Sequence, residues 1–147
     1  MSYRVRRDPR GVPGLTLHDE PAYCHALAAN VPALEAELAR GVWLVMAFAA
    51  WSGPDVDAVG DAIGLARRYG GRLSLGLRPY DDAAELNAWW PDADPDASGP
   101  FWVLLRDGEV RRHTAHRLAA DQLDEWVRAE ALQAIPPHPP ETRHDGA

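Results

Sequence analysis

The sequence predicts an α/β domain, a three-layer α/β/α sandwich in which helices cover both faces of a central mixed sheet of four to five strands. Three observations lead to this class. The unbroken apolar segment 42–49 has the length of a central strand that is covered on both faces. Segment 54–69 follows it with apolar residues at helical spacing and ends at two glycines. A second apolar strand, 101–105, continues through an Asp-Gly turn into a polar strand, 109–114.

The remaining elements complete an alternation of strands and helices along the chain. In chain order, we expect an edge strand over 15–17, a helix over 20–40 that is interrupted near Asn30, a strand over 72–78, and helices over 82–90 and 119–132. Residues 1–19 then form an N-terminal arm that carries the candidate edge strand, and residues 20–133 form the domain. Residues 134–147 contain almost no apolar side chain, and we expect a disordered tail there.

The composition favours a soluble, cytoplasmic protein of one domain. The chain has 147 residues, of which 46% are hydrophobic, so it can bury a core without disulfides. Cys24 is the single cysteine, which excludes an intramolecular disulfide and favours a reducing compartment. We expect neither a signal peptide nor a membrane partner, because no apolar run is long enough and none follows the N-terminal arginines. The lack of lysine and the abundance of alanine, glycine and proline are typical of a GC-rich, bacterial genome.

The charge balance argues against nucleic acid as a partner. The formal net charge is −7, whereas nucleic-acid binding relies on cations that face phosphates. We also expect no cofactor. We expect no metal site, because His113 and His116 would point to opposite faces of a strand. The N-terminal arm holds a local cluster of arginines, which we interpret as solvated: Arg4, Arg6, Arg7 and Arg10.

A five-residue motif, Trp51-Ser52-Gly53-Pro54-Asp55, lies where the buried strand 42–49 runs into the next helix. Farther along, Gly99-Pro100 directly precedes the apolar strand 101–105 and its hairpin. Over about residues 31–130 the sequence resembles thioredoxins, which carry Trp-Cys-Gly-Pro-Cys at the first place and a cis-proline at the second. The resemblance implies the thioredoxin fold, a cis bond between Gly99 and Pro100, and a site formed by the two segments.

The departures from the thioredoxin pattern fall on the residues that carry its chemistry. Thiol–disulfide exchange needs an attacking thiolate and a second thiol that resolves the mixed disulfide. Ser52 stands at the place of the first thiol, Asp55 at that of the second, and Met46 at that of the buried aspartate that assists it. We therefore predict a redox-inactive protein. Ser52 and Asp55 also match a capping-box pattern, which explains both side chains as the start of a helix.

The resemblance places a second loop beside the motif. Thioredoxins have a small apolar turn before the last helix, and the matching residues here are Ala115-His116-Arg117. With Trp51, Gly99 and Pro100 they would form a mixed polar and aromatic concavity. We expect a protein or peptide partner in a groove beside Pro100, with His116 and Arg117 favouring acidic partners. The helix N-terminus also favours an anion, although Asp55 opposes it.

Two other functions stay open at this point. One is an enzyme that uses non-dithiol chemistry around Ser52, Asp55 and His116. The other is monothiol redox chemistry through Cys24, which we place in the first helix as a small buried side chain. A deep, closed pocket that joins the three polar residues would favour an enzyme, whereas a shallow groove along Pro100 would favour the binding module that we expect. The sequence does not predict the partner, the pathway or the oligomeric state.

Overall fold

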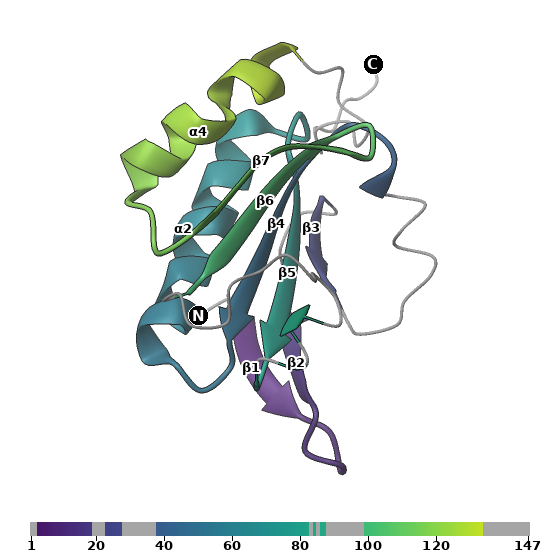
Figure 1. Cartoon of the computed structure of the whole chain (residues 1–147), viewed down its shortest axis with the longest axis vertical. Helices are drawn as coiled ribbons and strands as arrows, with labels where there is room; N and C mark the ends of the chain where they lie inside the picture. The colour runs from purple at the N-terminus through teal and green to yellow at the C-terminus, as the bar shows by residue number, and fades with distance from the viewer. Residues whose placement is uncertain are drawn as a thin grey trace.

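Five strands form the central sheet of the computed structural model, which describes residues 3–18, 23–27, 38–82, 84, 86–87 and 99–133 (Figure 1). The strands are β3 (Cys24–Ala26), β4 (Val42–Ala49), β5 (Ser74–Tyr80), β6 (Phe101–Arg106) and β7 (Glu109–Ala115). Their order across the sheet is β3-β5-β4-β6-β7. β5 runs parallel to both of its neighbours, whereas β6 is antiparallel to β4 and to β7. The predicted mixed sheet is confirmed.

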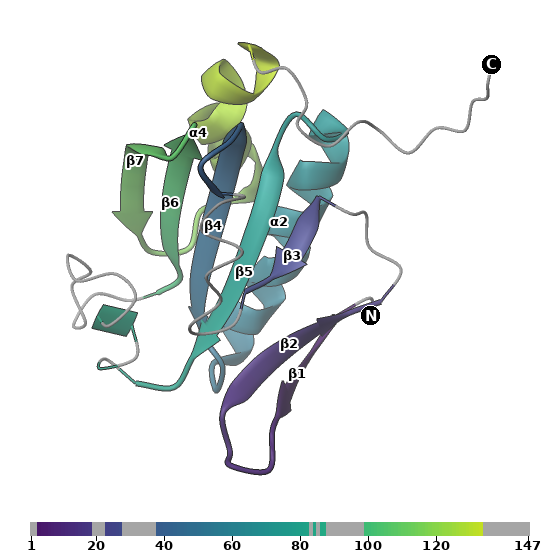
Figure 2. The same ribbon diagram turned by 90° about the vertical axis from the view of Figure 1, so that its right-hand side faces the viewer.

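Two long helices pack against each other on one face of this sheet (Figure 2). They are α2 (Gly53–Tyr69) and α4 (Ala120–Gln133), close to the bounds that the sequence predicts. α2 ends at Gly70, whose positive φ of 51° suits a residue without a side chain. Neither is long and apolar enough to cross a membrane, and the same holds for every helix within the described ranges.

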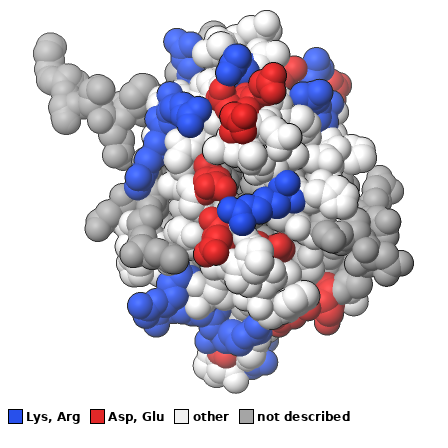
Figure 3. All heavy atoms as spheres, turned by 90° about the vertical axis from the view of Figure 1, so that its left-hand side faces the viewer, with Lys and Arg blue, Asp and Glu red and all other residues white. Residues whose placement is uncertain are grey.

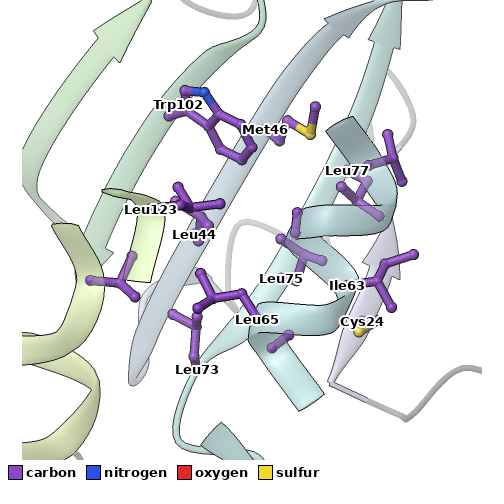
Figure 4. Packing of buried hydrophobic residues seen from close by; sticks show 14 of the residues in the cluster. Cys24, Leu44, Met46, Ile63, Leu65, Leu73, Leu75, Leu77, Trp102 and Leu123 are labelled. Atoms are coloured by element: carbon purple, nitrogen blue, oxygen red, sulfur yellow. The ribbon is translucent and has the colours of Figure 1, made fainter. Parts of the chain in front are cut away.

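β4 explains why the core has two sides. All eight of its residues are buried, and alternate side chains point to opposite faces of the sheet. Leu44 and Met46 face α2 and α4, where they pack with residues such as Trp102 and Leu123 (Figure 4). Trp43 belongs to a separate apolar cluster on the other face. A strand that is buried on both faces has to be apolar throughout, which is the pattern seen in the sequence.

The N-terminal arm differs from the prediction. β1 (Tyr3–Arg7) and β2 (Pro13–Leu17) form a two-stranded antiparallel sheet of their own, so the strand expected over 15–17 pairs with β1 and not with the central sheet. The arm is also not simply solvated, because Tyr3 and Leu15 belong to the main core cluster. The Tyr3 hydroxyl donates a hydrogen bond to the Val56 carbonyl in α2 at 2.9 Å.

The helix predicted over 20–40 is wrong over residues 24–26. These residues form β3, the edge strand beside β5, with Cys24 opposite Leu75. Pairing with a buried neighbour decides the conformation of so short a segment, whatever its local propensity. The predictions for 19–22, 28–37, 88–98 and 134–147 lie outside the described residues, as does part of the helix expected over 82–90.

Candidate functional site

The candidate site lies at the end of the sheet where β4 finishes and α2 begins (Figure 1). The motif Trp51–Asp55 occupies the connection between them and the first turn of α2. Gly99 and Pro100 come directly before β6, which pairs with β4. A Cβ atom built on Gly99 would lie 3.0 Å from Asp55 Oδ2, so the two predicted segments lie side by side. The Gly99–Pro100 peptide bond is cis.

Ser52 is the N-cap residue of α2. Its backbone is extended, with φ −97° and ψ 115°, and its Oγ accepts a hydrogen bond from the Asp55 N–H at 3.4 Å. Pro54 lies in the first helical turn, where its missing N–H leaves no helical hydrogen bond unmade. The Ser52 hydroxyl, which stands where the resemblance implies the first thiol, therefore caps a helix.

The Asp55 carboxylate does not complete a reciprocal capping box. In that box it would accept the N–H of the cap residue, but the Ser52 N–H donates to the Ala49 carbonyl at 3.1 Å. Asp55 Oδ2 instead accepts the Ala49 N–H at 2.9 Å. The residue is only 7% exposed. Asp55 thus connects the last residue of β4 to the first turn of α2.

Tyr80, the last residue of β5, is a neighbour that the sequence did not point to. The same Cβ atom on Gly99 would lie 3.2 Å from Tyr80 Oη, so the phenol and the Asp55 carboxylate both border Gly99. Burial, and after it the negative charge of Asp55, raise the pKa of Tyr80 to about 12. The phenol is protonated at neutral pH, as a tyrosine of ordinary pKa also is, and it offers a hydrogen-bond donor beside Gly99.

Trp51 projects into solvent at this end of the sheet. It is 71% exposed, more than any other large hydrophobic residue in the described ranges. Its indole Nε1–H donates to the Asp81 carbonyl at 3.1 Å. A ring that is held at its polar edge and open on its faces can take up an apolar or extended ligand.

His116 and Arg117 follow β7 at the place that the resemblance implies. His116 is exposed, has a positive φ of 82°, and accepts a hydrogen bond from the Trp102 Nε1–H at 3.0 Å through its carbonyl. The Arg117 guanidinium lies 3.3 Å from a carboxylate oxygen of Asp61 in α2. Its charge is therefore already offset within the protein, and His116 remains the more available of the two side chains.

The contacts do not connect Ser52, Asp55 and His116 as a nucleophilic triad would require. Within the described ranges, the side chains of Ser52 and Asp55 each accept a backbone N–H, and no hydrogen bond joins either to the His116 ring. Cys24 is buried, as predicted, but it lies in β3, so its predicted place in a helix is wrong. No group of three His, Cys, Asp or Glu in the described part of the chain could hold a metal ion.

The surface charges do not define a field of one sign beside α2 and α4. Arginines and acidic residues are interspersed on this face (Figure 3), and several of them are paired, as Arg128 is with Asp124 at 2.6 Å. A surface hollow of about 400 Å³ lies elsewhere, between β7 and α4, where it is lined by Arg112 and Trp126. Neither feature provides the closed polar pocket that would favour an enzyme at Ser52.

Tyr80 and Asp81 are the site residues that sequence reasoning missed. Tyr80 is the last residue of β5 and Asp81 follows it. β5 runs parallel to β4, and parallel neighbours finish at the same edge of a sheet. That rule could have placed them beside the motif, since strand 72–78 was predicted. The hairpin formed by β1 and β2 contacts Asp81 through Arg7, and no sequence pattern indicated that contact.

Comparison with known proteins establishes the fold. No family model and no curated protein matches the sequence. Among solved structures, a mutant thioredoxin from Halobacterium salinarum matches with a TM-score of 0.59 and 19% identity over 77% of this chain and 92% of that one. Thioredoxins from Plasmodium falciparum and Fasciola hepatica match with TM-scores of 0.57 and 0.54, at 13% and 19% identity. They cover 71% and 67% of this chain, and 95% and 88% of their own. The chain has the thioredoxin fold.

Proposed function

We propose that this chain is a redox-inactive thioredoxin-fold protein that binds an extended peptide, or an extended segment of a protein, beside Pro100 and Trp51. A single cysteine and a serine and aspartate in the motif leave no pair of thiols to cycle. A lone cysteine also suits a reducing compartment, and we propose the cytoplasm. The observation that carries the binding proposal is Trp51, an exposed aromatic side chain with a fixed polar edge.

The backbone beside Trp51 supports recognition by strand addition. The pairing of β6 with β4 begins at Phe101 opposite Ala47, and its pairing with β7 begins at Phe101 opposite Ala115. Gly99 lies beyond both ladders, so neither ladder uses its N–H or its carbonyl. An extended peptide could pair with these groups as an added strand, and Gly99 has no side chain to obstruct it.

Charge contributes less to this proposal than the sequence suggested. Arg117 is paired with Asp61, so a preference for acidic partners would depend mainly on His116. Asp55, which would repel an acidic ligand, is buried and already accepts a backbone N–H. We therefore propose that backbone pairing and the Trp51 ring provide most of the affinity, and that moderate salt changes it little.

The purified protein is expected to show no dithiol reductase activity. The measurement is an insulin-reduction assay with dithiothreitol, with an active thioredoxin as the positive control. A rate comparable to that of the thioredoxin would contradict the proposal. Weak activity that disappears in Cys24→Ser would instead identify a monothiol reaction at β3, although burial of that thiol argues against it.

Trp51→Ala is expected to weaken peptide binding by about 30-fold, the equivalent of the ~2 kcal/mol typical of an aromatic anchor. The ligand is a peptide selected against the parent protein from a random display library, and calorimetry gives its Kd. Leu132→Ala is the matched control, because Leu132 is also an exposed large hydrophobic residue but lies near the end of α4. If both variants weaken peptide binding equally, or if neither variant weakens it, the binding surface lies elsewhere.

A further inference from the structure

The β1–β2 hairpin contacts the candidate site at two points. Tyr3 donates to the Val56 carbonyl in the first turns of α2, as described above. At the other end of β1, Arg7 reaches Asp81, the residue that follows β5. Figure 2 shows the hairpin beside the end of the sheet where β4 and β5 finish. The hairpin therefore borders the first turns of α2, which follow Trp51 in the chain, and Asp81, whose carbonyl accepts the Trp51 indole N–H.

Arg7 and Asp81 form a two-pronged contact. Arg7 Nη1 donates to Asp81 Oδ2 at 2.7 Å, and Arg7 Nη2 donates to Oδ1 at 2.8 Å. This geometry fixes the orientation of the carboxylate as well as its position, because two parallel hydrogen bonds leave it little freedom to rotate. The guanidinium also donates to the Gly11 carbonyl at 2.9 Å, which ties it to the turn of its own hairpin.

Asp81 passes this restraint to Trp51. Its carboxylate is held by Arg7, and its carbonyl is the acceptor for the Trp51 indole N–H. Residues 81 and 82 form a bend after β5, so the Asp81 carbonyl lies past the last residue of β5 that pairs with β4, and the contact with Arg7 adds a restraint on the residue that carries it. An aromatic ring that is 71% exposed gains few packing contacts of its own. Its orientation then depends on the hydrogen bond at its edge.

We propose that Arg7 is a positioning residue for Trp51, acting through Asp81, and that the hairpin is thereby part of the binding site. This rests on the proposed function, in which Trp51 is the aromatic anchor. A side chain that is already held in its bound orientation loses less conformational freedom when a ligand arrives. The arginine cluster expected to be solvated thus includes one member with a role at the site.

The direct test reads the Trp51 indole N–H in the free protein. Heteronuclear ¹H–¹⁵N spectra resolve the indole signals, and Trp51→Phe assigns that of Trp51 by its loss. We expect Arg7→Ala and Asp81→Asn to shift and broaden this signal, and Arg7→Lys, which cannot form the two-pronged contact, to do so partly. Arg6→Ala is the matched control, because Arg6 is an exposed neighbour in β1 with no side-chain contact to Asp81 in the structure.

The signals of buried Trp43 and Trp102 report whether each variant keeps its fold. An unmoved Trp51 signal in Arg7→Ala or Asp81→Asn, or an equal shift in Arg6→Ala, would overturn the proposal. If Arg7→Ala disturbs the buried signals as well, Asp81→Asn decides. The selected peptide gives a second readout, since Arg7→Ala should weaken its binding about 2- to 10-fold. If Arg7→Ala and Asp81→Asn shift the Trp51 indole signal but Trp51→Ala binds the peptide as tightly as the parent, the positioning role of Arg7 stands and only the proposed function is contradicted.

Discussion

Trp102→Ala is expected to lower the free energy of unfolding by about 3–5 kcal/mol. Trp102 is fully buried in β6, opposite Met46 in the register with β4. Truncation leaves a cavity between the sheet and the helices, where Leu44 and Leu123 can move only partly to fill it (Figure 4). The His116 carbonyl also loses the indole N–H that it accepts at 3.0 Å.

Urea denaturation followed by circular dichroism measures the change, and Trp102→Phe is the control. Phenylalanine retains most of the apolar volume but cannot donate to the His116 carbonyl, so a smaller loss of about 1–2 kcal/mol is expected. The difference between the variants separates packing from hydrogen bonding. A loss below about 1 kcal/mol for Trp102→Ala would contradict the packing described for this face of the sheet.

Asp55→Ala is expected to destabilise the protein by about 1–3 kcal/mol. The substitution leaves the buried Ala49 N–H without the acceptor that Asp55 Oδ2 provides at 2.9 Å. It also removes a negative charge from the first turn of α2, which contributes about 0.3–1 kcal/mol where the charge is near the helix N-terminus. Both effects have the same sign, because the carboxylate accepts a donor and lies at the positive end of the helix.

Asp57→Ala is the matched control for Asp55→Ala. Asp57 lies two residues farther along α2 and is exposed, so its removal should change the stability by less than about 0.5 kcal/mol. Thermal and urea unfolding of both variants measure the two changes. An Asp55→Ala variant that is more stable than the parent would contradict the structural role. It would indicate instead that a buried carboxylate is kept for function despite its effect on stability.

The parts of the fold that the sequence predicted are those fixed by local chemistry. β4 is apolar throughout because both of its faces are covered, and its length marks it as a strand. The turn at Asp107 and Gly108 has positive φ at both residues, 52° and 83°, which an Asp-Gly pair adopts readily. α2 has its cap at Ser52 and its end at Gly70, both visible as residue types.

The parts that were missed depend on partners far away in the sequence. β3 is three residues long and is a strand because β5 lies beside it, so no local pattern distinguishes it from a helix. The hairpin contributes Tyr3 to the core through contacts with α2, 53 residues later in the chain. At the site, the cap role of Ser52 is local and predictable. The acceptor role of Asp55 toward Ala49, six residues earlier, depends on how the chain turns from β4 into α2, and the approach of Tyr80 appears only once the strands are assembled.

The most direct test of peptide binding beside Pro100 is a titration of the ¹⁵N-labelled protein with the display-selected peptide. We predict that the largest shifts fall on the backbone N–H of Gly99, which lies outside the sheet ladders, and on the indole N–H of Trp51. The signals of β7 and α4 should change little. Shifts confined to those two elements, with Gly99 and Trp51 unmoved, would contradict binding beside Pro100 and place the ligand at the hollow beside Trp126.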